Sequence, residues 1–358
     1  MPVGKPLPFI GNIRDVEPEA FGFFYCKITS PEFLEHPILQ RRIKTEQGTR
    51  TIAGLGTWYG WIFSEEMDNA MKYGYLFEIF KGYQFNKGNI FSSYINKMYN
   101  LRLQYPKGDA MNLTAKLLMN SLYGKFGMNT EITKVEILDN DPEIINKYLD
   151  KLNTNILDTI YLENKIVLIY KTNKFTPADI NDVFHDDIFH AFDVNIAIAS
   201  AISAYARIKM SYFKNNPNFK LYNSDTDNIV INKPLPNDLI GEGLGLMKLE
   251  HVITKAVFLA PKVYGLLEEN GNEIIKAKGL KKSTIKSIKV SDLEKLLIKD
   301  SSIIFNQEKG YKDLYESNIK VLNSIYTLKA TSNKRLPIYK NGKFDSTKPY
   351  NYDEITSE

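Results

Sequence analysis

Two aspartates, Asp225 and Asp227, flank a single threonine near the middle of the chain. The surrounding residues 222–231 have the pattern of a β-hairpin with the two carboxylates at its tip. A spacing of two would point both side chains to the same side of a strand. Like charges held close together are costly unless a cation lies nearby, and oxygen ligands of this type suit Mg²⁺. The pair is therefore a candidate metal site, although an acidic, solvated turn has the same pattern.

A predicted helix over residues 109–123 carries a second polar group. Lys116, Asn120 and Tyr123 are spaced i, i+4, i+7 and fall on one face, where an ammonium can bind a triphosphate and a phenol ring can lie against a nucleoside. The opposite, packing face is expected to comprise Met111, Ala115, Leu118 and Leu122. The helix is expected to end at Gly124. An ordinary amphipathic surface helix is the alternative interpretation.

A third candidate feature is basic. Lys262 and Tyr264 precede a stretch, residues 276–289, that no acid interrupts. Such a cluster suits a phosphate backbone, and its affinity would fall as salt rises. A solvated charged face is the alternative. The lysines of the stretch are Lys276, Lys278, Lys281, Lys282, Lys286 and Lys289.

The elements that would position these residues follow from apolar periodicity and from breakers. Residues 1–63 read as strands and loops, with turns at 54–61, and Ser64 is a candidate N-cap for the next helix. The last 70 or so residues read as Lys-rich and mostly helical. The expected elements between these regions are a helix over 64–74, a strand over 75–85, a helix from 90, strand-like runs at 159–162 and 165–170, and a long helix over 193–213.

Composition excludes some functions. The net charge is +4, so the distribution of charge is more informative than its sum. Cys26 is the only cysteine, which rules out an intrachain disulfide and a cysteine zinc site. No apolar run reaches the roughly 18–20 residues of a membrane helix. His185 and His190 are five residues apart and are expected in a solvated loop, whereas Trp58 and Trp61 are expected in the core.

In order and spacing, these features resemble the family B DNA polymerases of the protein-primed, viral and linear-plasmid type. Residues 116–124 (KLLMNSLYG) resemble the fingers motif K-x3-N-S-x-Y-G, and the continuation KFG at 125–127 is typical of that branch. Residues 225–227 (DTD) resemble the palm motif. Residues 262–264 and 276–279 resemble the motifs that contact the primer.

The resemblance implies a role for each candidate residue. Lys116 would bind the phosphates of the incoming dNTP, and Asn120 and Tyr123 would shape its pocket. Asp227 would ligate two catalytic Mg²⁺ ions, supported by Asp225 directly or through water. Primer-template DNA would be held by Lys262, Tyr264, Lys276, Lys278, Lys281 and Lys282.

The implied fold is α+β, a partial right-hand polymerase with family-specific insertions. A terminal priming protein is a further implied partner, and no membrane is implied. The implied location is a mitochondrion if the chain is of linear-plasmid origin, and otherwise cytoplasmic or viral. The implied divisions are 1–85 (palm edge and first insertion), 86–127 (fingers), 128–192 (second insertion), 193–275 (palm) and 276–358 (thumb and C-terminal tail).

One departure from the family affects activity. The family needs a first aspartate in a D-x-x-S-L-Y-P motif before the fingers, because two metal ions are held by that residue and the palm aspartate. No such motif precedes Lys116, and no exonuclease domain is recognisable. The sequence therefore predicts a DNA polymerase chain that begins downstream of this motif, with an incomplete metal site. The alternatives are an inactive DNA-binding remnant and a structural fragment.

Overall fold

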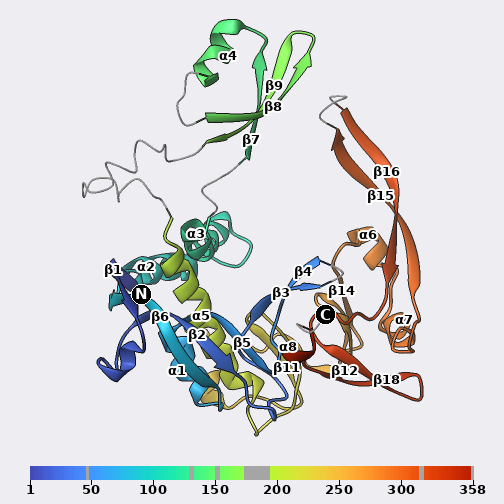
Figure 1. The fold of residues 1–358 in the computed structure, drawn as a ribbon. Coiled ribbons are helices and arrows are strands. Elements are labelled where there is room, and N and C mark those ends of the chain that lie inside the picture. The colour runs from blue at the N-terminus through green and yellow to red at the C-terminus, as the bar shows by residue number, and fades with distance from the viewer. Residues whose placement is uncertain (46–47, 129–132, 150–153, 173–193, 314–317, 356–358) are drawn as a thin grey trace. The chain divides into compact units, whose positions relative to one another are not determined.

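The structure is a computed structural model that describes residues 1–45, 48–128, 133–149, 154–172, 194–313 and 318–355 (Figure 1). It contains 26% helix and 42% strand, which confirms the α+β class. The chain forms two compact units. The first comprises Met1–Lys5, Phe85–Ser203 and Tyr311–Lys320, and the second comprises Pro6–Gln84, Ala204–Gly310 and Val321–Glu358.

A four-stranded sheet dominates the N-terminal part of the second unit. Its strands lie in the order β1 (Pro2–Ile10), β6 (Leu76–Lys87), β2 (Gly22–Thr29) and β5 (Thr57–Phe63), with β2 antiparallel to both β5 and β6. Residues of β2 alternate strictly between buried and half-buried, which is the signature of a sheet with only one face on the core. The buried face carries Phe24, Cys26, Ile28, Trp58 and Ile62.

Helix α1 (Ser64–Met71) supplies Met67 and Ala70 to this core. The C-terminal half of α5 (Ile196–Lys214) is tied to α1 by an ion pair, in which the Arg207 guanidinium donates hydrogen bonds of 2.6 and 2.7 Å to the Glu66 carboxylate. Ser64 was expected to cap α1. Its hydroxyl instead accepts a hydrogen bond from the Gly22 amide at 3.1 Å, so that expectation was wrong.

A second core in this unit lies under a three-stranded sheet of β12 (Ile253–Ala260), β13 (Val263–Glu268) and β14 (Glu273–Ala277). Helix α7 (Val290–Lys295) packs on one face through Val290 and Leu293. The other face is more exposed, and Tyr264 on β13 pairs there with Lys276 on β14.

The described residues of the first unit include a pair of packed helices and a smaller sheet with a helix of its own. Helix α2 (Ser92–Leu103) packs on α3 (Ala110–Phe126), and the Asn112 amide donates to the Arg102 and Tyr105 carbonyls at 3.0 and 2.9 Å. The smaller sheet has the order β7 (Thr133–Asp139), β9 (Lys165–Thr172) and β8 (Thr154–Leu162), with α4 (Pro142–Leu149) following β7. Tyr148 and Tyr170 both donate hydrogen bonds to Glu136, which fastens α4 to this sheet.

Several expectations from periodicity are confirmed, including α2, α3, α5 and the hairpin near residue 225. Others were wrong. Residues 54–61 were expected as turns, but residues from Thr57 form β5. Strand β7 and helix α4 lie in a segment for which no helix or strand was expected. A strand whose partner is distant in sequence leaves a weaker local signal than a helix does.

The prediction of a mostly helical C-terminus was also wrong. The described residues there form only short helices and two pairs of hydrogen-bonded strands. The pairs are β15 (Ile303–Asp313) with β16 (Asn318–Leu328), and β17 (Leu336–Lys340) with β18 (Lys343–Lys348). Burial along β15 alternates over Ile303–Gln307, so a period of two was present beneath the lysine-rich composition. The remaining elements are η1 (Ile13–Asp15), β3 (Arg41–Thr45), β4 (Gly48–Ile52), β10 (Leu221–Asp225), β11 (Asn228–Ile231), η3 (Asn237–Leu239), α6 (Lys282–Ile285) and α8 (Tyr352–Ile355).

Among the described residues, none of the helices has the length and apolarity needed to cross a membrane.

Candidate functional site

The two aspartates lie at the turn of the β10–β11 hairpin. Asp225 is the last residue of β10 and pairs with Asn228, the first residue of β11. The Asp227 amide donates to the Asp225 carbonyl at 2.8 Å, which closes a three-residue turn around Thr226. Thr226 has φ of 58°, a conformation that is strained for a β-branched residue. Only Asp225 is therefore in a strand, and the alternation rule does not orient Asp227.

Asp225 has partners for both carboxylate oxygens. The Lys262 ammonium lies 2.6 Å from Oδ2, and the Thr226 hydroxyl donates to Oδ1 at 3.1 Å. The hydrogen bond from Lys262 is the main reason that the pKa of Asp225 is lowered from its ordinary value. Reciprocally, the hydrogen bond to Asp225 raises the pKa of Lys262.

The backbone aims Lys262 at this aspartate. Lys262 follows Pro261 in the tight turn between β12 and β13 and has φ of 61°, the left-handed position usually taken by glycine or asparagine. A residue other than glycine in this conformation carries a cost of about 1–3 kcal/mol, and here its side chain forms the ion pair with Asp225. Asp227, in contrast, is exposed, and its charge also raises the pKa of Lys262.

The other predicted DNA-contacting residues lie on or beside the three-stranded sheet that presents Lys262. The Lys278 amide donates to the Lys262 carbonyl at 3.1 Å, so the two motifs are neighbours in space. Tyr264 is half-buried, whereas Lys276, Lys278, Lys281 and Lys282 are exposed. The structure thus brings all six residues into the second unit, together with Asp225 and Asp227.

Two residues that sequence reasoning missed hold this lysine segment. The buried Gln307 amide donates to the Gly279 carbonyl at 2.9 Å and accepts from the Lys281 amide at 3.1 Å. The Tyr326 hydroxyl donates to the Lys278 carbonyl at 2.7 Å. Gly279 has φ of 98°, and a Cβ there would lie 2.7 Å from the Tyr326 ring, so glycine is required on both counts.

Lys334 is a further cation that the sequence did not single out. Its ammonium donates to the Thr51 carbonyl in β4, and its charge contributes to lowering the pKa of Asp225. Burial and, after it, the charge of Arg50 lower the pKa of Lys334 from its ordinary value. Asp225 therefore lies in a positive field from residues far apart in the sequence, for which no local sequence signal existed.

The nucleotide-binding candidates lie on α3 in the first unit. Asp109 caps the helix, with its carboxylate accepting from the Met111 amide at 2.7 Å. Lys116, Asn120 and Tyr123 are all exposed, and half of Tyr123 is accessible. All three side chains are thus accessible on one helix, and their role in nucleotide binding stays a prediction.

The packing face of α3 was only partly predicted. Ala115 is buried and Leu122 is half-buried, but Met111 and Leu118 are 40% and 43% exposed. The helix also continues through Gly124 to Phe126, where the Gly127 amide caps it. A glycine within a helix lowers its stability by about 1 kcal/mol relative to alanine but does not by itself end the helix.

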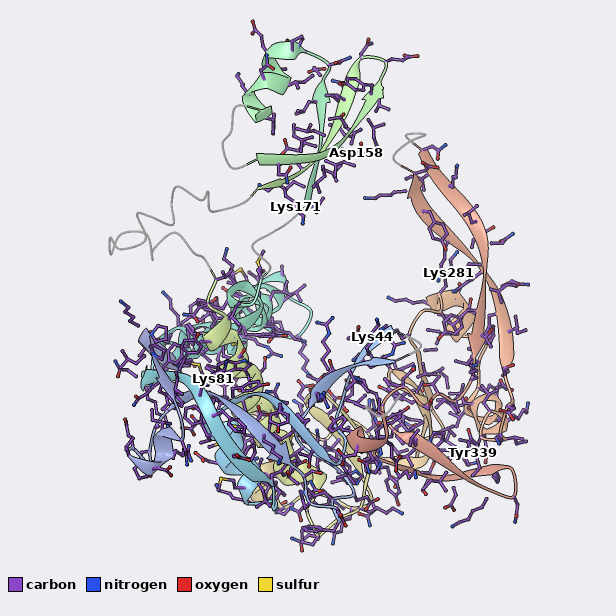
Figure 2. All side chains as sticks on the ribbon, viewed as in Figure 1. Lys44, Lys81, Asp158, Lys171, Lys281 and Tyr339 are labelled. Carbon is purple, nitrogen blue, oxygen red and sulfur yellow. The ribbon has the colours of Figure 1, made fainter. Side chains whose placement is uncertain are left out.

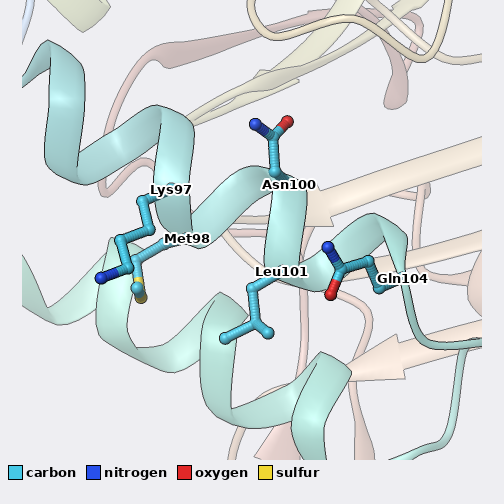
Figure 3. A pocket seen from close by; sticks show the side chains of 5 residues that line it. All are labelled: Lys97, Met98, Asn100, Leu101 and Gln104. Carbon is cyan, nitrogen blue, oxygen red and sulfur yellow. The ribbon is translucent and has the colours of Figure 1, made fainter.

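Two other candidate features contribute less to a functional site. A hollow on α2 is lined by one helix and its C-terminal cap and contains no acid (Figure 3). His185 and His190 lie outside the described residues. The hollow is lined by Lys97, Met98, Asn100, Leu101 and Gln104.

This arrangement corresponds to a known class of protein. The structure resembles Phi29 DNA polymerase complexed with primer-template DNA and incoming nucleotide substrates, with a TM-score of 0.63 at 16% identity over 92% of this chain and 55% of that one. The binary complex of the same enzyme gives a TM-score of 0.60 at 17% identity. The fold is therefore that of a DNA polymerase of this type.

Sequence comparison specifies the family. The family described as "DNA polymerase type B, organellar and viral" matches residues 1–218, and the chain belongs to it. Probable DNA polymerases of Ascobolus immersus, Neurospora intermedia and Agaricus bitorquis are 36%, 34% and 30% identical over 98%, 90% and 90% of this chain. The chain spans 28%, 33% and 42% of their respective lengths.

Family members generally use divalent metal ions. The described residues do not form a full site for them, because no group of three or more acidic, histidine or cysteine side chains comes together there. Lys262 and Thr226 hold the two oxygens of Asp225, which leaves Asp227 as the exposed carboxylate of the hairpin. One such carboxylate cannot fix a pair of ions in place.

Proposed function

We propose that this chain is the palm, fingers and thumb portion of a DNA-directed DNA polymerase. The reaction is transfer of a nucleotidyl group from a dNTP to a primer 3′-hydroxyl, or to a hydroxyl of a terminal protein at initiation. The observation that carries the proposal is the Lys262–Asp225 ion pair beside Asp227. It joins the hairpin aspartates to the same sheet that carries Tyr264 and Lys276.

The roles follow from charge and exposure. Lys116 on α3 supplies a cation for the triphosphate, and Asn120 and Tyr123 line the nucleotide site. Asp227 is the carboxylate available to a Mg²⁺ ion, and Asp225 orients Lys262 rather than competing for the metal. Lys262 contributes a positive charge where the primer terminus carries phosphate. Catalysis by these residues is positioning and electrostatic stabilisation.

The exposed lysines of β14, α6 and the segment between them bind the phosphate backbone. Together with Lys286 and Lys289, which follow α6, they make six lysines without an acid between them. Their affinity for DNA should fall with salt, by roughly one log unit in affinity per log unit in salt for each phosphate neutralised. Changing Lys276, Lys278, Lys281 and Lys282 to glutamate should weaken primer-template binding and flatten its salt dependence.

Primer extension tests the proposal. The isolated chain should bind a primer-template but extend it very weakly, since the described residues lack the second carboxylate. Addition of the part of the Ascobolus relative that lies outside the matched region should restore extension in trans, and Asp227→Asn should abolish it. Restored extension that survives Asp227→Asn would contradict the assignment of the hairpin.

A catalytically inactive DNA-binding remnant is the second candidate, favoured by the incomplete carboxylate set. A remnant of this kind should bind DNA in a salt-sensitive way, and primer extension should not be restored in trans. The same titration and extension measurements separate the two.

We further propose that the chain serves replication of a linear plasmid or viral-type genome in mitochondria. Its support is the family description and the fungal origin of the relatives. Localisation of the tagged chain to the cytosol alone, with no mitochondrial fraction, would contradict this.

A further inference from the structure

The four-stranded sheet has a second face that does not contribute to the core. Strand register places Tyr25 between Trp61 on β5 and Lys81 on β6, and places Phe23 between Phe63 and Tyr83 in the next row. Because the alternate residues Phe24, Cys26 and Ile28 are buried, these side chains occupy the opposite side. We refer to Tyr25, Tyr59, Trp61, Phe80, Lys81 and Tyr83 as the aromatic face.

Rings on this face are ordered against one another but remain open to solvent. Trp61 and Tyr83 stack with centroids 5.7 Å apart and planes 20° apart, and Trp61 also contacts Tyr25 at 5.6 Å. Tyr59 lies 6.0 Å from Phe80. The exposed fractions are 51% for Trp61, 45% for Tyr83 and 55% for Tyr59.

One end of the aromatic face is covered by a helix, and a lysine lies within the face. Phe63, at its end, is buried against Tyr205 of α5, so the open part begins at Trp61. The Lys81 ammonium lies 5.6 Å from the centroid of the Tyr25 ring. Figure 2 labels Lys81 on β6. In the next row Glu78 is opposite Lys27, whereas Lys81 is opposite Tyr25, the cross-strand partner of Trp61.

This combination differs from an ordinary structural aromatic cluster. Trp58 is 5% exposed and packs on Tyr352, which is the environment that the sequence predicted for both tryptophans. For Trp61 that prediction was wrong. Large rings held half-open in a contiguous group indicate a binding surface, because solvent exposure of such an apolar patch is unfavourable.

The chemistry of the face selects a partner. Flat rings with exposed faces stack on nucleic-acid bases without regard to sequence, and a neighbouring lysine can pair with the phosphate between them. A four-stranded sheet with its back covered by helices and aromatic residues on its front is a geometry that binds unpaired bases in other proteins. Duplex DNA conceals its base faces, so it would not engage these rings.

We infer that the aromatic face binds single-stranded DNA, with bases stacked on Trp61 and Tyr83 and a phosphate at Lys81. This inference rests on the proposed polymerase function, in which the unpaired template is the single strand at hand. It assigns to the sheet a contact separate from the lysines of β14 and α6.

Tryptophan fluorescence reports directly on this contact, because the chain has two tryptophans and one of them is buried. Titration of the chain with an unlabelled oligo-dT strand should quench emission in the wild type. Trp61→Phe, which retains only Trp58, should show no quenching. Affinity for a labelled strand, measured by anisotropy, should fall about tenfold or more in Trp61→Ala and Tyr83→Ala, within the roughly 5- to 150-fold range expected for lost stacking.

Matched controls separate stacking from general damage. Tyr161→Ala removes a tyrosine that is 69% exposed on β8 and should leave affinity unchanged. Lys81→Glu should weaken binding and reduce its salt dependence, whereas Lys81→Arg should retain both. Each variant should unfold at the same urea concentration as the wild type, which establishes that lost binding is local.

The outcomes distinguish this inference from the proposed function. Binding of duplex primer-template with no quenching of Trp61 by the single strand would overturn the inference and leave the polymerase proposal intact. Self-association at micromolar concentration, abolished by Trp61→Ala and without quenching, would identify a second copy as the occupant and also overturn it. Absence of any DNA binding by the chain would remove the proposed function itself.

Discussion

The ammonium of Lys262 lies 2.6 Å from Oδ2 of Asp225, and this ion pair makes the two hairpin aspartates chemically unequal. Asp225 is neutralised by a residue 37 positions away, whereas Asp227 remains exposed. A symmetric pair of carboxylates would have to bring a cation from solvent to offset their repulsion. Here the chain supplies that cation itself.

Removal of this cation should change how Asp225 titrates. In Lys262→Met, the pKa of Asp225 should rise from its depressed value toward the ordinary 3.8. Because the folded-state pKa is lowered, the pair stabilises the fold at pH values above 3.8, and this contribution is lost as the pH falls through the depressed pKa. NMR titration of the Asp225 carboxyl carbon measures the shift, and the variant should show a smaller loss of stability in acid.

Lys255→Met is the control for this titration. Lys255 forms an exposed ion pair with Glu294 at 2.9 Å and should change the pKa of Glu294 only. An Asp225 pKa that is the same in wild type and Lys262→Met would show that the ion pair does not form in solution.

The turn between the aspartates should tolerate glycine better than valine. Thr226→Gly removes the strain of a β-branched residue at φ of 58°. It also removes the hydrogen bond from the hydroxyl to Asp225 and makes the unfolded chain more flexible, and both changes are destabilising. Because these effects oppose one another, the free energy of unfolding should change by less than about 1 kcal/mol. Thr226→Val keeps the branch and loses the hydroxyl, and it should cost about 1 kcal/mol more. Urea unfolding of both variants measures the difference. Equal stability of the two variants would contradict the strained turn.

Gln307 should be needed for both stability and DNA binding. Gln307→Leu leaves the Gly279 carbonyl and the Lys281 amide without their side-chain partner, at a cost of about 1–3 kcal/mol. The lysine segment should then loosen, and primer-template affinity should fall. Urea unfolding and anisotropy measure the two effects. Asn306→Leu, at an exposed neighbouring position, should be close to neutral, and an equal loss there would refute a specific role for Gln307.

The ion pair between α1 and α5 should contribute more than surface ion pairs do. The side chain of Glu66 is 9% exposed and that of Arg207 is 32% exposed, so Glu66→Gln leaves a partly desolvated guanidinium without its charge partner. The expected loss is about 3 kcal/mol in the free energy of unfolding. Glu294→Gln in the exposed pair with Lys255 should lose under about 1 kcal/mol. Similar losses in both variants would contradict this ranking.

The sequence alone determined the features that depend on neighbours along the chain. The i, i+4, i+7 face of Lys116, Asn120 and Tyr123 follows from the helical period, and the Asp225–Asp227 hairpin follows from two short strands around a polar tip. The order of the motifs was sufficient to recognise the family. These inferences need no knowledge of distant contacts.

Tertiary structure decided what depends on pairing across the chain. Lys262 reaches Asp225, Gln307 holds Gly279 and Lys281, and Trp61 lies on the open side of a sheet because of strand register. The C-terminal strands escaped prediction for the same reason, since a strand is stabilised by partners and by the face it buries rather than by its own residues. Composition assigned charge to these segments, but only folding determined which charges and rings lie side by side.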